Sequence, residues 1–201
     1  MNDPHATRFS LLVRLRDMQE DTEAWFEFVE IYTPVVYGFL RKRGLQDADA
    51  ADVTQDVFGK VSRSIRGFQC DRQLGSFRGW LLAVTRNSLA DLHETRSRQP
   101  VGSADTAVHR LLEEESADDG SQQTWESEYR QSVFGWAVRH IRNDFEERTW
   151  QAFWKTGVEG LSAKDVAEAL DMSVGAVYTA KCRVLDQLKQ TIQRVEKESE
   201  S

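Results

Sequence analysis

The sequence has 201 residues, and its 33 acidic and 26 basic side chains give a formal net charge of −7. Its 40% hydrophobic content can fill a core, but no apolar run reaches the roughly 18–20 residues of a membrane span. The N-terminal MNDPHATRFS lacks the basic-then-apolar order of a secretion signal, and the two cysteines, Cys70 and Cys182, lie far apart. From these features we expect neither a secreted nor a membrane protein, but a cytoplasmic one with free thiols.

Helical periodicity dominates the first half of the chain. Apolar residues at helical spacing predict helices in RFSLLVRLRDM, AWFEFVEIY and VVYGFLRKRGL. Asp21 can cap the second, Pro34 should force a restart or kink before the third, and Gly44 is a plausible stop. The same pattern in DADAADVTQDVFGKVSRSIRGF and FRGWLLAVTRNSLADLHETR predicts two more helices. Residues 1–98 therefore form one predicted helical domain.

The charges of the chain are unevenly distributed. Residues 60–98 hold eight basic and three acidic side chains, and residues 174–194 hold four basic and one acidic. Between them, EEESADD at 113–119 has five acids in seven residues. This pattern predicts a flexible acidic linker over residues 99–123, followed by a second helical domain over 124–198. Two cationic segments suit contact with phosphates, although a solvated helix face gives the same pattern.

The segment SAKDVAEALDMSVGAVYTAKCRVLDQL has the layout of a helix-turn-helix. Ser162 and Asp165 form a capping box, and Ser173 can cap a second helix that starts at Val174. Asp171 stands where such turns favour Gly, and it tolerates a left-handed backbone better than most residues. Val177 can pack on the first helix. A plain helical hairpin without DNA contact remains the alternative interpretation, but the polar and cationic surface of the second helix favours DNA reading.

Taken together, these segments resemble the extracytoplasmic-function (ECF) group of bacterial sigma factors in the sigma-70 superfamily. AWFEFVEIYTPVVYGFLRKRG, DADAADVTQDVFGKV and GSFRGWLLAVTRNSLADLHETR resemble sigma domain 2. The helix-turn-helix segment resembles the minus-thirty-five reader of sigma domain 4. The resemblance implies an all-α fold of two small helical domains, and a non-enzymatic protein that binds core RNA polymerase and directs promoter recognition and transcription initiation.

The resemblance assigns an interface for core polymerase to the helix that contains DVTQDVF. In the family this face grips a basic coiled coil of the largest polymerase subunit. The residues that match are Asp52, Gln55, Asp56 and Phe58. The first three fall at i, i+3 and i+4 and so share one helix face. A solvated acidic face is the open alternative for these residues.

The resemblance also assigns two DNA contacts. The expected minus-ten residues lie on the promoter-melting helix and the loop before it: Arg72, Ser76, Phe77, Arg78, Arg86, Asn87, Asp91, Arg96 and Arg98. The expected minus-thirty-five residues lie on the reading helix: Ser173, Val174, Gly175, Ala176, Tyr178, Thr179, Lys181, Cys182 and Arg183. Many family members carry further cations where this chain has Tyr178 and Ala180. We expect Leu185 and Leu188 to serve packing instead.

Two other classes of function remain to be weighed. Acidic side chains at helical spacing can hold a divalent metal for phosphohydrolysis, but no facing carboxylate pair is evident. His5, His93, His109 and His140 show no ligand spacing, so we expect neither a metal nor another cofactor. A helix-turn-helix regulator that acts without polymerase predicts a ligand-binding or dimerising segment, and none is visible. We also expect control of the free protein, by an anti-sigma factor or another regulator.

Overall fold

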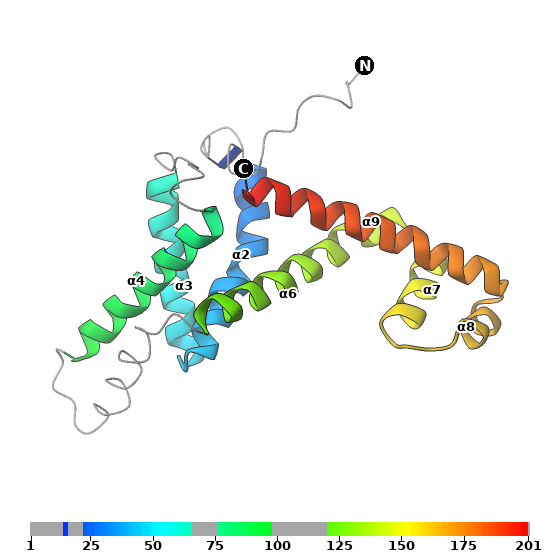
Figure 1. Ribbon diagram of the computed structural model, residues 1–201, viewed down its shortest axis with the longest axis horizontal. Helices are drawn as coiled ribbons and strands as arrows, with labels where there is room; N and C mark the ends of the chain where they lie inside the picture. The colour runs from blue at the N-terminus through cyan, green and yellow to red at the C-terminus, as the bar shows by residue number, and fades with distance from the viewer. Residues whose placement is uncertain (1–13, 16–21, 66–75, 98–119, 201) are drawn as a thin grey trace, which may run out of the picture. The chain divides into compact units, whose positions relative to one another are not determined.

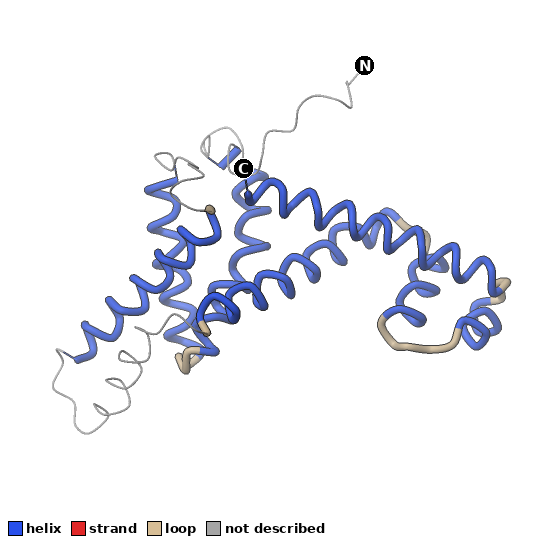
Figure 2. The backbone as a smooth tube through the Cα atoms, viewed as in Figure 1, coloured by secondary structure: helices blue, strands red, loops and turns tan. Residues whose placement is uncertain are grey.

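The computed structural model describes residues 14–15, 22–65, 76–97 and 120–200 (Figure 1). These residues form helices joined by turns and short loops, with no strand among them (Figure 2). The predicted all-α class is confirmed. Within the same residues, no helix is both long enough and apolar enough to cross a membrane.

The chain divides into two compact units. Met1–Ser132 and Lys197–Ser201 form unit 1, and Val133–Glu196 forms unit 2. The division falls inside helix α6 (Ser121–Ile141), whereas the sequence pattern placed the second domain at 124–198 after a linker over 99–123. Because residues 98–119 lie outside the described part of the chain, the predicted domain bounds stay a prediction.

Unit 1 is built on helix α2 (Thr22–Lys42), against which α3 (Asp47–Ser64) and α4 (Phe77–Ser97) pack. The helices meet in an aromatic core. The ring centroid of Phe28 on α2 lies 4.9 Å from that of Tyr32 and 5.8 Å from that of Phe77. All three side chains are buried. Edge-to-face and tilted rings at these separations stabilise a core beyond their buried area.

Helix α2 runs through Pro34, so of the two outcomes predicted at this residue, a restart or a kink, the restart does not occur. Proline removes one helical hydrogen bond, but buried Ile31 and Val35 on either side hold both halves of α2 on the core. The predicted stop at Gly44 is confirmed. Gly44 has φ = 87°, a left-handed backbone that ends the helix with little steric cost.

The first three turns of α6 belong to unit 1. Trp125 and Tyr129 are buried there, with ring centroids 5.6 Å from Phe39 and 5.8 Å from Tyr32 of α2. The ammonium nitrogen of Lys42 forms an ion pair with a carboxylate oxygen of Glu128 at 2.6 Å. The same carboxylate lies against Gly38, where a Cβ atom would approach it to 2.0 Å. A glycine at position 38 therefore leaves room for this pairing.

Unit 2 contains the rest of α6, a 3-10 turn η2 (Arg142–Asp144), helices α7 (Glu147–Gly157) and α8 (Ala163–Leu170), and helix α9 (Val174–Glu200) as far as Glu196. Its apolar core around α8 consists of Ala152, Val166, Ala167, Val177 and Ala180. Leu170 and Met172 pack against this cluster. The contact of Val177 with α8 that the sequence predicted is confirmed, and small side chains let the helices approach closely.

Candidate functional site

The three polar residues predicted to share one face of α3 all lie on an exposed side of that helix. Asp52, Gln55 and Asp56 are all exposed, while Val53 and Val57 on the opposite side of the helix are buried. Phe58 is different, because it is half-buried and its ring lies 5.4 Å from Phe28 and 6.3 Å from Trp25. The surface of α3 is therefore an acidic strip beside an aromatic side chain anchored in the core.

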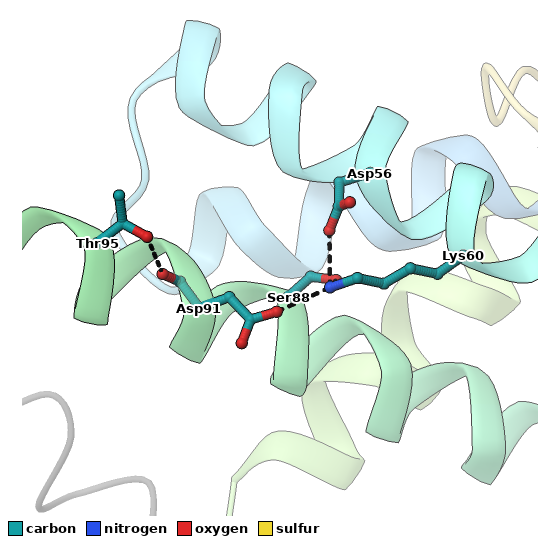
Figure 3. Close-up of polar contacts among 5 residues, drawn as sticks. All are labelled: Asp56, Lys60, Ser88, Asp91 and Thr95. Carbon is teal, nitrogen blue, oxygen red and sulfur yellow. Dashed lines mark hydrogen bonds and ion pairs between the residues drawn. The ribbon is translucent and has the colours of Figure 1, made fainter.

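Lys60 joins this strip to α4 (Figure 3). Its ammonium nitrogen lies 2.9 Å from an oxygen of Asp56, 2.9 Å from an oxygen of Asp91 and 2.9 Å from the hydroxyl of Ser88. An ammonium group has three hydrogens to donate, and these three partners can take one each. We call Asp56, Lys60, Ser88 and Asp91 the Lys60 network. Sequence reasoning missed Lys60 because its link to α4 spans 31 positions.

The contacts within the Lys60 network shift the pKa values of Asp56 and Lys60. Partial burial raises the pKa of Asp56, but hydrogen bonds from Lys60 and Ser88 and the charges of Lys60 and Arg63 outweigh it, so the pKa lies below 3.8. Partial burial lowers the pKa of Lys60, but hydrogen bonds and charges from Asp91 and Asp56 raise it above 10.5. Both shifts favour the charged form, so Asp56 and Lys60 stay ionised across the neutral range.

The residues predicted for the minus-ten contact separate into several groups. Ser76 caps α4, because its hydroxyl accepts a hydrogen bond from the Gly79 amide at 3.2 Å. Asn87 is exposed, Arg86 is half-buried, and Asp91 and Arg96 are exposed but paired with Lys60 and Asp49 of α3. Arg72 and Arg98 lie outside the described residues.

The side chain of Phe77 is buried, and that of Arg78 is largely covered. Phe77 has no exposed surface and packs between Phe28 and Tyr32. The guanidinium of Arg78 lies 4.7 Å from the ring centroid of Tyr129 and 3.8 Å from Glu126, both on α6, and its side chain is 16% exposed. Helix α6 thus covers Arg78 in the free protein. We leave Phe77 out of the proposed DNA contacts, because contact would require it to leave the core.

In unit 2, the helix-turn-helix forms through the local contacts expected of it. Ser162 caps α8 by accepting from the Asp165 amide at 3.2 Å, and its hydroxyl donates to the Asp165 carboxylate at 2.7 Å. Asp171 has φ = 51°, the left-handed turn conformation. Ser173 caps α9 by accepting from the Ala176 amide at 3.1 Å. These three predictions are confirmed.

The exposed strip of α9 is narrower than the predicted reading set. We call it the α9 strip; its members are Ser173, Val174, Gly175, Tyr178, Thr179, Cys182 and Arg183. Ala176 is half-buried. Lys181 is also half-buried, and its ammonium donates to the Thr156 carbonyl of α7 at 3.4 Å. Leu188 is buried as predicted, but Leu185 is 45% exposed, so its assignment to packing is wrong.

Arg148 on α7 holds the turn between α8 and α9. Its guanidinium donates to the Leu170 carbonyl at 2.8 and 2.6 Å and also to the Asp171 carbonyl. These carbonyls lie at the end of α8, where helical partners are lacking and a cation is favoured. Arg148 therefore fixes the angle at which α9 leaves the turn. Sequence reasoning missed it, although a basic residue on an adjacent helix is a recognisable partner for such a turn.

No group of three or more His, Cys, Asp or Glu side chains that could hold a metal occurs among the residues the structure describes. Cys182 is a free, exposed thiol, as its spacing predicted. Three surfaces carry the predicted contact residues: the acidic strip of α3 (Asp52, Gln55 and Asp56), the polar face of α4 (Asn87, Asp91 and Arg96) and the α9 strip.

Two of these surfaces, on α3 and α4, lie in a part of the chain that matches a known family. Residues 28–99, which cover most of α2 and all of α3 and α4, match sigma-70 region 2. The chain is 25% identical over 166 residues to the ECF RNA polymerase sigma factor SigE of Mycolicibacterium smegmatis, covering 83% of this chain and 60% of that protein. It is 28% identical over 182 residues to the ECF RNA polymerase sigma-E factor of Haemophilus influenzae, covering 89% and 92%.

The three packed helices of unit 1 thus match sigma-70 region 2 from residue 28 onward, and the other unit of the chain contains a helix-turn-helix. The chain is similar to RNA polymerase sigma factors of the extracytoplasmic-function group, and its residues 28–99 match sigma-70 region 2. It spans 60% of the length of the first of these relatives.

Proposed function

We propose that this protein is an initiation factor of the ECF sigma type, which binds core RNA polymerase and directs it to promoters. The observation that carries the proposal is the exposed acidic strip of α3 inside a matched sigma-70 region 2. An acidic strip that meets a basic coiled coil gives both fast association and a defined register. The protein itself would make no covalent change, and it would act in the cytoplasm, where polymerase and promoters are.

In this proposal Asp52, Gln55 and Asp56 contact the largest polymerase subunit, and Phe58 supports them from the core. Arg86, Asn87 and Arg96 on α4 contact the minus-ten element together with Arg72 and Arg98. Opened DNA strands are held by phosphate charge and by stacking, for which arginine is well suited. Arg78 would join them only after α6 moves away from it.

The α9 strip would read the minus-thirty-five element. Tyr178 is 58% exposed and Val174 41%, so both offer apolar surface to base edges, while Arg183 offers a cation to phosphate. Lys181 points back to α7, so we expect it to contribute less than Arg183. Binding here should depend more on shape and apolar contact than in relatives with more cations.

Reconstitution tests the proposal. Purified protein, core polymerase and a panel of promoter fragments are combined, and co-elution with core and run-off transcription are measured. We expect a stable complex and initiation on a subset of promoters that share two spaced elements. A protein that neither co-elutes with core nor supports initiation on any fragment contradicts the proposal.

A helix-turn-helix regulator that acts without polymerase is the alternative, and the acidic strip of α3 does not favour it. Such a regulator would bind promoter fragments equally well with and without core polymerase. Gel-shift titrations of the free protein and of its polymerase complex separate the two functions, because only the proposed sigma factor needs core polymerase to act at a promoter.

A further inference from the structure

Lys60 lies between two surfaces that prefer opposite charges. The acidic strip of α3 suits a basic protein partner, whereas the α4 face suits DNA phosphates. The ammonium group touches a carboxylate of each, Asp56 on α3 and Asp91 on α4, at 2.9 Å (Figure 3). Neither Asp56 nor Asp91 is buried, with 48% and 67% of their side chains exposed. Both carboxylates are therefore accessible to an approaching partner.

The charges of the Lys60 network sum to −1, from two carboxylates and one ammonium group. Without Lys60 the same patch would carry −2 beside Asn87 and the other polar residues of α4. A carboxylate next to DNA repels phosphate, so neutralising Asp91 favours DNA binding. The same positive charge beside Asp56 weakens the attraction of the acidic strip for a basic partner. The charge of Lys60 therefore favours DNA binding at α4 and disfavours the binding of a basic partner at the acidic strip of α3.

We propose that Lys60 is a positioning residue that sets the balance between polymerase binding and minus-ten binding. It holds Asp91 neutralised toward DNA and, at the same time, reduces the negative potential that Asp56 presents to polymerase. The inference rests on the proposed function, since it needs both partners. It adds a role for a residue outside the predicted contact sets, and that role is electrostatic rather than a direct contact with either partner.

The test compares the full-length protein with its Lys60→Gln and Lys60→Arg variants. Core affinity is measured by titrating labelled protein with polymerase, and minus-ten affinity by titrating each holoenzyme with a single-stranded oligonucleotide that carries the element. For Lys60→Gln we expect core association on the order of three-fold tighter and oligonucleotide binding on the order of three-fold weaker, as for partly exposed charges. Lys60→Arg keeps the charge, so we expect it to stay near wild type in both assays.

Two controls separate this role from general effects. Lys189→Gln on α9 removes the same charge at an exposed position outside the network, and we expect it to leave both affinities unchanged. In an Asp91→Asn background the charge that Lys60 neutralises is absent. We therefore expect Lys60→Gln to weaken oligonucleotide binding there by less than half as much as in the wild type.

The outcomes distinguish this inference from the proposed function. Opposite shifts in the two affinities support it, because a merely destabilised protein would lose both together. If both affinities fall together, or if neither changes while the wild type binds core and oligonucleotide normally, Lys60 has no such role. If the wild type itself binds neither partner, the proposed function fails and this inference fails with it.

Discussion

At the scale of single residues, Asp52 tests the proposed polymerase face most cleanly, because it is exposed and lies outside the Lys60 network. We expect Asp52→Arg and Asp56→Arg each to weaken core binding on the order of ten-fold, since like charges would then face each other across the interface. Equilibrium titration with core polymerase measures the change. Thermal unfolding should show little difference, because an exposed residue contributes little to stability.

The matched control is Asp186→Arg, which reverses an exposed charge on α9 and should leave core affinity unchanged. Asp56→Arg also disturbs Lys60, so the Asp52 variant decides the question. An Asp52→Arg protein that binds core as tightly as the wild type would remove the acidic strip from the proposed interface.

The Lys60 network also predicts a pH dependence of stability. The lowered pKa of Asp56 means that its contribution is present above pH 3.8 and is lost as pH falls through the lower folded-state value. The raised pKa of Lys60 means that its contribution is present below pH 10.5 and is lost as pH rises through the higher folded-state value. The difference in unfolding free energy between wild type and Lys60→Gln should therefore be constant from about pH 5 to about pH 9 and shrink outside that range.

Denaturant unfolding at several pH values measures this difference, which we expect to be below about 1 kcal/mol because the pairs are partly exposed. Glu168, an exposed acid on α8, provides the comparison through Glu168→Gln, whose effect should not follow the same profile. A difference between wild type and Lys60→Gln that changed steadily between pH 5 and pH 9 would show that other groups control it.

Single residues also show what the sequence could predict. Asp52, Gln55 and Asp56 could be grouped correctly because helical spacing alone puts them on one face. Lys60 could not be found in this way, since its contact with Asp91 requires α3 to be packed on α4. Phe77 could have been recognised as core, because it falls four positions before buried Leu81 and eight before buried Thr85.

At the scale of elements, Arg148 controls the helix-turn-helix from outside it. We expect Arg148→Ala to lower the unfolding free energy by about 1 kcal/mol, since charge-assisted hydrogen bonds to the end of α8 would be lost. Binding to a minus-thirty-five duplex should weaken as well, because α9 would leave the turn at a less fixed angle. Thermal unfolding and duplex titration measure the two effects.

Arg148→Lys keeps the charge but not the forked geometry, so we expect an intermediate loss in both measurements. Arg139→Ala on α6 removes an exposed arginine elsewhere in unit 2 and should change the duplex affinity little. If Arg148→Ala bound the duplex like the wild type, the turn would be held by Ser162, Asp171 and Ser173 without help from α7.

The elements differ in how well local rules describe them. The Ser162 and Ser173 caps and the left-handed Asp171 follow from rules that concern four or five neighbouring residues, and the sequence predicted all three. The helix does not restart at Pro34, because burial on both sides of it outweighs the lost hydrogen bond, and burial depends on the partner helices. Leu185 was misjudged because α9 carries an apolar residue where no other helix of unit 2 covers it.

At the scale of the whole molecule, the open question is where the first domain ends. The sequence pattern ends it at residue 98, but the first three turns of α6 contribute buried Trp125 and Tyr129 to unit 1. Composition predicted a linker in the acidic stretch before α6, but could not predict that the helix after this stretch packs on α2. That return depends on the match between aromatic faces, including Phe39 with Trp125.

The end of the first domain can be tested with two fragments, residues 1–132 and residues 1–119. Removing a buried Trp or Tyr side chain costs about 3–5 kcal/mol, so the shorter fragment should be the less stable by at least about 3 kcal/mol. In a small domain this lowers the melting temperature by about 10 °C or more. Circular dichroism during heating measures both fragments.

Full-length Tyr129→Ala provides the companion measurement, since it should destabilise unit 1 and uncover Arg78 without shortening the chain. Tyr129→Phe keeps the ring and should preserve most of the stability. Equal melting temperatures for the two fragments would show that α6 rests on α2 without stabilising it. In that case the first domain would end before Ser121, as the sequence pattern predicts, and the contacts of Arg78 with Tyr129 and Glu126 would be too weak to hold it away from DNA.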